Sequence, residues 1–286
     1  MILCGGLGTR LREYTDLRPK PMVEIGGKPI LWHIMRSFAH YGYRDFVLCL
    51  GYRGDVIREY FLNYEAMRRD CTIHLGGQGP GEISWHASHG AQEPEFRVTL
   101  AETGANTMTG GRLAAVEKYI DGESFLLTYG DGLADVPIDE VVRFHRAHGK
   151  TATVTAVQPQ SRYGVLKLDG DGVVEGFEEK PQGGEWINAG FFVFHRRIFQ
   201  YLDGPSSILE RRPLEALASQ GELCAYRHRG FFQAMDTLPE HRYLNQLWNN
   251  DTAPWKIWDR GSESGEGLCN LAEQLAGEER KQGVRL

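Results

Sequence analysis

The sequence lacks any long hydrophobic run. No stretch approaches the roughly 20 apolar residues that a bilayer-spanning helix needs, and the start shows no charged-then-apolar signal segment. We therefore expect no membrane partner. Cysteine is scarce and scattered, with five residues, an odd number, and no Cys-x-x-Cys pair. This pattern argues against a disulfide framework and a zinc site, and it predicts free thiols in a reducing, cytoplasmic compartment.

The chain also lacks an excess of basic residues. Its 32 Lys and Arg face 38 Asp and Glu, and the net charge of −6 argues against a nucleic-acid partner. The remaining composition, with 41% hydrophobic and 24% charged residues, is ordinary for a globular chain. A length of 286 residues supports either one α/β domain or one such domain with appendages. We predict a domain over residues 1–258 and a peripheral tail, rich in Gly, Ser and Glu, over 259–286.

A glycine-rich loop follows the first short apolar strand. It reads Gly5-Gly6-Leu7-Gly8-Thr9-Arg10, and it lacks both the third glycine of a dinucleotide-binding loop and the Gly-Lys-Ser/Thr of a P-loop. A tight turn without a ligand is one interpretation. The other is an anion nest for phosphate, because Arg10 adds a planar cation and Lys20 lies between two stiff prolines. With these two cations beside it, the loop predicts a triphosphate site.

Hydrophobic periodicity predicts alternating strands and helices. Met1 falls where the middle of the first strand would normally lie. We therefore expect this strand to begin upstream of Met1. Further apolar runs predict strands at 46–50, 96–100, 124–129, 151–157, 191–194 and 223–226. Helical spacing predicts helices at 30–38, 56–64, 113–119, 138–148, 209–220 and 238–248. This alternation indicates βαβ units and a mostly parallel sheet covered on both faces.

Two segments interrupt this alternation. Residues 76–95 form a glycine-rich insert that carries His86 and His89, and we interpret it as a surface loop because no third metal ligand is nearby. Residues about 159–190 contain the turn Asp169-Gly170-Asp171-Gly172, which predicts a β-hairpin. We expect this small antiparallel excursion to form one side of a cleft.

Two aspartates are candidate magnesium ligands. Asp131 follows the 124–129 strand, at the carboxyl end where open α/β sheets bind ligands, although a plain Asp-Gly turn is common there. Asp236 precedes the 238–248 helix and could instead cap it, but Thr237 is the better cap. We favour the metal interpretation, since Mg²⁺ binds one or two carboxylates together with phosphate oxygens.

The remaining candidates lie in two loops. In 103–112, we expect Thr109 to cap the following helix, while the loop backbone borders a nucleobase and Arg112 reaches the nucleotide. Lys180 is either a solvated surface lysine or a cation that binds a ligand, with Glu179 and Asn188 as further polar contacts.

The segments Gly-Gly-x-Gly-Thr-Arg-Leu at 5–11 and Pro19-Lys20-Pro21 resemble the signature of sugar-1-phosphate nucleotidylyltransferases. Thr-Gly-Gly-Arg at 109–112 and Met-Asp-Thr at 235–237 resemble the cytidylyl branch of that family, and the similarity covers about residues 2–258. The resemblance implies a Rossmann-like three-layer α/β fold of the GT-A-like nucleotidyltransferase kind, with a mostly parallel mixed sheet. It also implies transfer of CMP from CTP to glucose 1-phosphate with Mg²⁺, for CDP-deoxysugar synthesis, by a homo-oligomer such as a hexamer.

The resemblance further implies a role for each site residue. Arg10 would bind the leaving pyrophosphate, Lys20 would bridge the nucleophile and the α-phosphate, and Lys180 would anchor the sugar phosphate, with Lys20, Arg10 and Asp131 as the catalytic set. Asp131 and Asp236 would hold Mg²⁺. The nucleotide would contact Leu3, Gly5, Gly6, Gly8, Thr9, Arg10, Lys20, Thr109, Gly110, Arg112 and Gly130. The sugar phosphate would contact Tyr129, Glu179, Lys180, Asn188 and Gly190.

Rival interpretations remain open. A GT-A glycosyltransferase would be expected to show Asp-x-Asp after a strand, whereas Asp131 is followed by Gly132 and Leu133. A non-catalytic nucleotide-sugar-binding subunit would be expected to lack a charged catalytic position. Sister enzymes that use dTTP, UTP or GTP, or another sugar 1-phosphate, differ only in base and sugar contacts. A carbonyl of the 103–111 loop could accept the 4-amino group of cytosine, but the sequence does not identify it.

Overall fold

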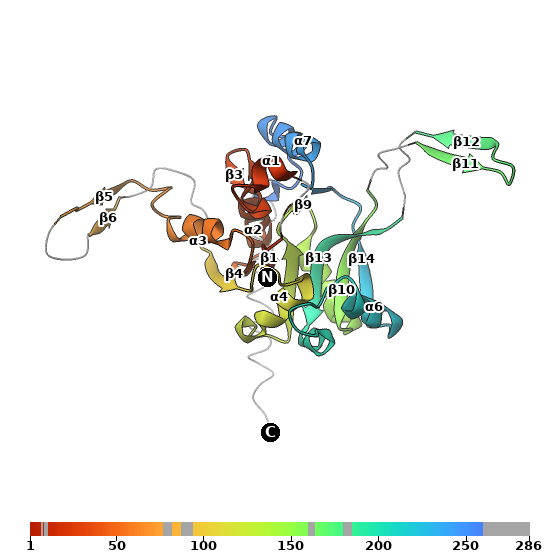
Figure 1. Cartoon of the computed structure of the whole chain (residues 1–286), viewed down its shortest axis with the longest axis horizontal. Helices are drawn as coiled ribbons and strands as arrows, with labels where there is room; N and C mark the ends of the chain where they lie inside the picture. The colour runs from red at the N-terminus through yellow and green to blue at the C-terminus, as the bar shows by residue number, and fades with distance from the viewer. Residues whose placement is uncertain are drawn as a thin grey trace, which may run out of the picture.

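A computed structural model describes residues 1–6, 8, 11–76, 82–86, 94–159, 164–179 and 185–259. A seven-stranded sheet forms the centre of this part of the chain (Figure 1). From edge to edge its strands are β14 (Leu223–Arg227), β10 (Ala152–Val157), β13 (Ile187–His195), β8 (Ser124–Tyr129), β1 (Ile2–Leu3), β4 (Asp45–Leu50) and β7 (Arg97–Glu102).

The sheet is parallel except for one strand. β1 pairs in parallel with β4 and β8, so that Ile2 lies opposite both Leu48 and Thr128. β13 runs antiparallel to its neighbours β8 and β10. The sequence prediction of a mostly parallel mixed sheet is therefore confirmed, and the carboxyl ends of β1, β4 and β8 meet at one edge.

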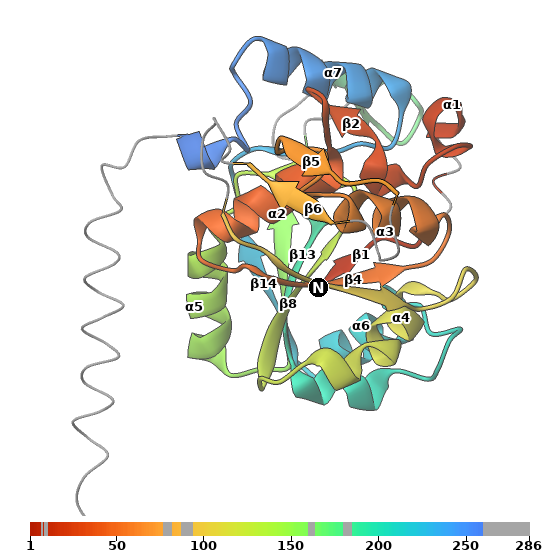
Figure 2. The same ribbon diagram turned by 90° about the vertical axis from the view of Figure 1, so that its left-hand side faces the viewer.

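Helices cover both faces of the sheet and give three layers (Figure 2). One core contains apolar side chains of α2 (Ile30–His40), α3 (Gly54–Leu62), α5 (Ile138–His148) and α7 (Leu238–Asn249). The other core contains Leu113 of α4 (Thr109–Ala115), Ile198 of η4 (Arg196–Tyr201) and Leu217 of α6 (Arg212–Ser219). Each helix buries an apolar stripe against the sheet, which is how the 3.6-residue period in the sequence becomes a layer.

Short elements border the carboxyl edge of the sheet. They are α1 (Arg12–Thr15), the 3₁₀ turn η2 (Lys20–Met22), the paired strands β2 (Glu24–Ile25) and β3 (Lys28–Pro29), and the paired strands β9 (Gly132–Ala134) and β15 (Phe232–Ala234). Two further 3₁₀ turns, η3 (Glu117–Tyr119) and η5 (Ile257–Asp259), lie elsewhere in the chain. The β9–β15 pair joins segments about 100 residues apart, and both of its strands adjoin predicted metal ligands.

Two hairpins project from opposite sides of the body (Figure 1). β11 (Val165–Leu168) and β12 (Val174–Glu178) form the antiparallel hairpin expected in the 159–190 excursion. β5 (Cys71–Ile73) pairs with β6 (Ile83–Trp85), so the insert that we interpreted as loop contains a strand. Thr72 Oγ1 lies 2.9 Å from His86 Nε2 in this hairpin, whereas His89 lies outside the described residues.

The structure settles both predicted helix caps. Thr237 caps α7, and the Glu240 carboxylate accepts from the Asp236 and Thr237 backbone N–H groups at 2.7 and 2.8 Å. The predicted cap at Thr109 is wrong, because Met108 occupies the N-cap position and the Thr109 hydroxyl donates to Glu210 at 2.6 Å. A nearby carboxylate on another segment competes successfully with the helix backbone for this hydroxyl.

Within the described ranges, no helix is long and apolar enough to cross a membrane.

Candidate active site

A cavity of about 660 Å³ opens at the carboxyl ends of β1 and β8. Glycine-loop residues form one part of its wall, the 105–109 loop another, and the end of β8 a third. Its lining residues are Leu3, Cys4, Gly5, Gly6, Gly8, Lys20, Pro21, Ala105, Asn106, Thr107, Met108, Thr109, Arg112, Tyr129, Gly130 and Asp131. Segments that the sequence analysis selected separately therefore meet at the edge where α/β sheets bind their ligands.

Lys20 lies between the two predicted metal ligands. Its ammonium donates to Asp131 Oδ2 at 2.7 Å and to Asp236 Oδ1, and its side chain is only 11% exposed. Burial alone would lower the pKa of Lys20, but the charges and hydrogen bonds of Asp131 and Asp236 outweigh it and the pKa is raised. Lys20 is thus a fixed cation at neutral pH.

The backbone explains why these three residues meet. Lys20 begins the short turn η2, in which the neighbouring Pro19 and Pro21 restrict the chain. Asp131 lies between β8 and β9, and its carbonyl accepts from the Met235 N–H at 2.8 Å. Pairing of β15 with β9 therefore places Asp236 beside Asp131, although the two are far apart in the sequence.

The two carboxylates suit a divalent cation that arrives with phosphate. Among the described residues, no group of three or more His, Cys, Asp or Glu side chains is placed to hold a metal. Two carboxylates with phosphate oxygens and water are the usual Mg²⁺ ligand set, so the donors fit Mg²⁺ bound together with a nucleotide. Bound there, Mg²⁺ would supply charge neutralisation for the phosphates.

The glycine loop is shaped by its packing as well as by ligand access. A Cβ on Gly5 would lie 2.2 Å from the Arg112 guanidinium, whereas a Cβ on Gly6 would meet open space. Gly8 has a φ of 63°, which favours glycine. Thr9 and Arg10, predicted to bind the nucleotide, lie outside the described residues, as does Lys180 on the sugar side.

Arg112 lies in the cavity wall and is buried, with 4% of its surface exposed. Its guanidinium donates to the Leu50, Gly104 and Gly5 carbonyls at 2.9, 2.8 and 2.9 Å. Further contacts go to Thr103 Oγ1 at 2.7 Å and the Ala105 carbonyl at 3.3 Å. The predicted nucleotide ligand therefore also ties the glycine loop, the end of β4 and the 104–105 loop together. The sequence analysis missed these carbonyl contacts, because main-chain acceptors leave no residue-type signal.

Three of the predicted sugar-side residues lie together. Gly190 has a φ of 78°, its N–H donates to Asn188 Oδ1 at 2.7 Å, and a Cβ there would lie 2.4 Å from the Tyr129 ring. The Tyr129 hydroxyl donates to Glu210, a residue that the sequence analysis missed because it stands within a predicted helix.

Two other predicted site residues lie apart from this group. Glu179 directly follows β12 on the projecting hairpin. Gly110 packs against Ser207 and is not among the residues that line the cavity.

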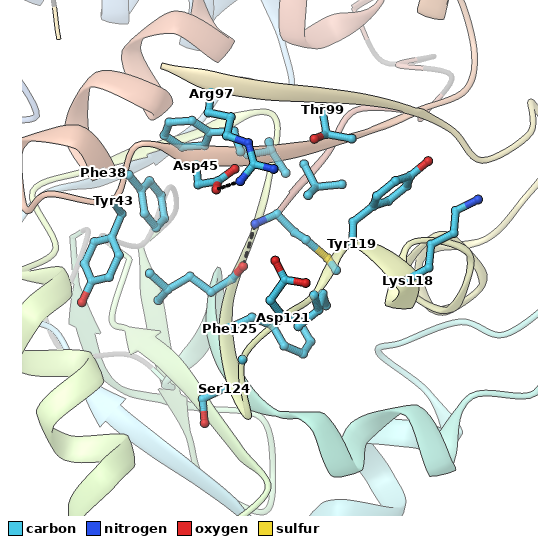
Figure 3. Close-up of a pocket in the computed structure, with 17 residues that line it drawn as sticks. Phe38, Tyr43, Asp45, Arg97, Thr99, Lys118, Tyr119, Asp121, Ser124 and Phe125 are labelled. Atoms are coloured by element: carbon cyan, nitrogen blue, oxygen red, sulfur yellow. Dashed lines mark hydrogen bonds and ion pairs between the residues drawn. The ribbon is translucent and has the colours of Figure 1, made fainter. Parts of the chain in front are cut away.

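A second cavity, of about 490 Å³, lies at the opposite edge of the sheet, near the amino ends of β1, β4 and β8 (Figure 3). Figure 3 shows Arg97 paired with Asp45, and their Nη1 and Oδ2 atoms lie 2.8 Å apart. The Met1 ammonium donates to the Leu126 carbonyl at 2.8 Å. The charges of Arg97 and Asp45 neutralise each other, and this edge is not where open α/β sheets bind ligands. We therefore assign the active site to the cavity at the carboxyl ends.

The family model for nucleotidyl transferases matches residues 1–220, and the chain belongs to this family. It is 50% identical over 261 residues to the glucose-1-phosphate cytidylyltransferase of Salmonella typhi, covering 91% of this chain and 99% of the relative. It is 43% identical over 260 residues to a probable glucose-1-phosphate cytidylyltransferase of Bacillus subtilis, covering 90% and 99%.

Solved structures support the fold. HddC from Yersinia pseudotuberculosis matches with a TM-score of 0.60 and 23% identity, over 86% of this chain and 97% of that one. A UDP-glucose pyrophosphorylase complexed with UDP-glucose matches with a TM-score of 0.60 and 15% identity, over 87% and 97%. The predicted nucleotidyltransferase fold is therefore confirmed.

Proposed function

We propose that this chain transfers CMP from CTP to α-D-glucose 1-phosphate, giving CDP-glucose and pyrophosphate, as the first step of CDP-deoxysugar synthesis. The similarity to two cytidylyltransferases over nine-tenths of the chain supports the reaction. The observation that carries the chemistry is the Lys20 ammonium between Asp131 and Asp236, on the wall of a cavity built from the glycine loop.

The reaction needs positioning and charge neutralisation more than covalent help from the protein. A phosphate oxygen of glucose 1-phosphate attacks the α-phosphorus in line, the bond to the β-phosphate oxygen breaks, and pyrophosphate leaves with that electron pair. The attacking oxygen is already anionic, so no general base is required. The raised pKa keeps Lys20 protonated, and it serves as a cation for the transferring phosphate. Asp131 and Asp236 would hold Mg²⁺ as the cofactor, which would supply further neutralisation of the phosphate charges.

The other residues divide between the two substrates. On the nucleotide side we assign the glycine loop with Thr9 and Arg10, and we add the residues Leu3, Lys20, Thr109, Gly110, Arg112 and Gly130. On the sugar side we assign Tyr129, Glu179, Lys180, Asn188 and Gly190. Residues 1–258 form the catalytic domain in this proposal, with 259–286 peripheral to it.

We further propose that the enzyme is a cytoplasmic homo-oligomer, such as a hexamer. The β11–β12 hairpin supports this assembly, because it projects from the body and exposes apolar side chains, with Phe177 65% and Leu168 57% exposed. An isolated two-stranded hairpin is only marginally stable in water, so contact with another copy would stabilise it. Light scattering of the purified chain tests this proposal, and a monomer at working concentrations would contradict it.

The decisive experiment measures pyrophosphate release with Mg²⁺ and glucose 1-phosphate, offering CTP, UTP, dTTP and GTP separately. We expect release with CTP in clear excess over the others. Release that favours another nucleotide would make the chain a sister enzyme with the same chemistry. Binding of CTP without release with any nucleotide would favour a different sugar 1-phosphate or a non-catalytic subunit.

A further inference from the structure

The segment between η4 and α6 packs directly on the start of α4. The Pro205 carbonyl accepts from the Met108 N–H at 2.9 Å, and the Ser207 carbonyl accepts from the Gly111 N–H at 3.1 Å. The approach is close, because a Cβ on Gly111 would lie 2.4 Å from the Pro205 carbonyl oxygen. This segment therefore holds Glu210 at a fixed place beside the cavity.

The Glu210 carboxylate joins two residues that line the cavity. Its Oε2 accepts from the Thr109 hydroxyl at 2.6 Å, and its Oε1 accepts from the Tyr129 hydroxyl. Thr109 belongs to α4 and Tyr129 ends β8, so one carboxylate connects two parts of the cavity wall. Hydrogen bonds to an ionised acceptor are roughly twice as strong as neutral ones.

These bonds decide what the two hydroxyls can offer to a substrate. Each hydroxyl has one hydrogen, and in both residues that hydrogen is given to Glu210. Burial first, and then the Glu210 charge, raise the pKa of Tyr129, so its hydroxyl stays protonated. The Thr109 oxygen also accepts from the Leu209 N–H at 2.9 Å, and the Tyr129 oxygen accepts from the Asn188 side chain, so each oxygen keeps part of its acceptor capacity. Only lone pairs remain, and lone pairs bind donors such as sugar hydroxyls and do not bind phosphate oxygens.

We propose that Glu210 is a positioning residue for the transfer reaction. It acts through Tyr129 and Thr109, turning both hydroxyls into acceptors for hydroxyl groups of the substrates. The phosphates are thereby left to the cation of the cavity wall, Lys20. This inference rests on the proposed function, since it assigns Tyr129 to the sugar phosphate and Thr109 to the nucleotide.

The first test compares Glu210→Ala with Glu210→Gln, measuring kcat and the KM of each substrate separately. We expect Glu210→Ala to raise the KM of glucose 1-phosphate roughly tenfold or more, the size of one lost charge-assisted hydrogen bond. Glu210→Gln should fall between, because its amide oxygen can accept one hydroxyl while its NH₂ group cannot accept the other. Glu215→Ala, an exposed carboxylate on α6, is the matched control and should leave both KM values unchanged.

Double-mutant cycles separate a positioning role from a merely structural one. If Glu210 acts through Tyr129, Glu210→Ala should change the KM of glucose 1-phosphate less than about threefold in a Tyr129→Phe background. The corresponding cycle with Thr109→Val should show the same coupling in the KM of CTP.

Two results would overturn the inference. One is a Glu210→Ala enzyme whose KM values both stay within about twofold of the parent, and the other is full additivity in both cycles. Thermal melting of each variant shows whether it is folded; should the alanine variant unfold, Glu210→Gln carries the same cycles. The proposed function fails separately, because its failure would appear as an unmodified enzyme that releases no pyrophosphate from CTP.

Discussion

Replacing Lys20 with methionine tests the charge arrangement at the centre of the site. Methionine has a similar length, so the substitution mainly removes the ammonium. Asp131 and Asp236, whose side chains are 33% and 23% exposed, then lose the cation between them. In the unmodified chain both carboxylates bind the same nitrogen, so their bonded oxygens lie within about 5 Å of each other. At that distance, with an effective dielectric constant of 20, two like charges repel by about 3 kcal/mol.

Water reaches both carboxylates, so the cost in folding free energy is smaller than this Coulomb figure. We expect Lys20→Met to lose about 1–2 kcal/mol without metal, below the range for breaking a fully buried pair. For a chain of this size that corresponds to a fall in Tm of roughly 2–8 °C. Excess Mg²⁺ should restore most of the loss, because the metal replaces the missing ammonium, and it should stabilise the unmodified chain less.

The assay is thermal denaturation in EDTA and in excess MgCl₂. Lys256→Met is the matched control, since Lys256 also lies between two aspartates, Asp251 at 2.9 Å and Asp259 at 2.7 Å, but these are 81% and 53% exposed. It should melt nearly as the parent does and respond to Mg²⁺ no differently. Turnover of Lys20→Met should fall about a hundredfold or more, far beyond its stability loss. A Lys20→Met chain that is unaffected by Mg²⁺, or that keeps near-parental turnover, would refute this reasoning.

Two further predictions concern a glycine and a buried histidine. Gly190→Ala should raise the KM of glucose 1-phosphate and lower Tm, because a Cβ at φ 78° would collide with the Tyr129 ring; unchanged steady-state kinetics would contradict this contact. His33 is fully buried, and burial lowers its pKa from 6.5 to about 4. Unfolded His33 therefore binds a proton below pH 6.5 that the folded chain does not take up until about pH 4. The contribution of His33 to the free energy of unfolding should be complete above pH 6.5 and fall by up to about 3 kcal/mol on acidification to pH 4. Urea unfolding at a series of pH values measures this change. For His33→Gln, the free energy of unfolding should depend less steeply on pH.

Local pattern alone determined much of the architecture. The 124–129 run is β8, and the helical spacing at 138–148 is α5, with the same bounds as predicted. Both follow from side-chain periodicity, which reports directly which face of an element is buried. The position of Asp131 after a parallel strand was enough to place it at the ligand-binding edge, since the carboxyl ends of parallel strands share that edge.

Only the tertiary structure decided which residues meet. The contact of Lys20 with Asp236 spans 216 positions and depends on the β9–β15 pairing, for which neither short strand gives a strong local signal. The same holds for Glu210, whose carboxylate takes the Thr109 hydroxyl away from the predicted helix cap. Residue type specifies what a side chain can donate or accept, but its partner is set by chain segments distant in sequence. The sequence therefore determined the chemistry available at this site, and the packing of distant segments decided which groups bind one another.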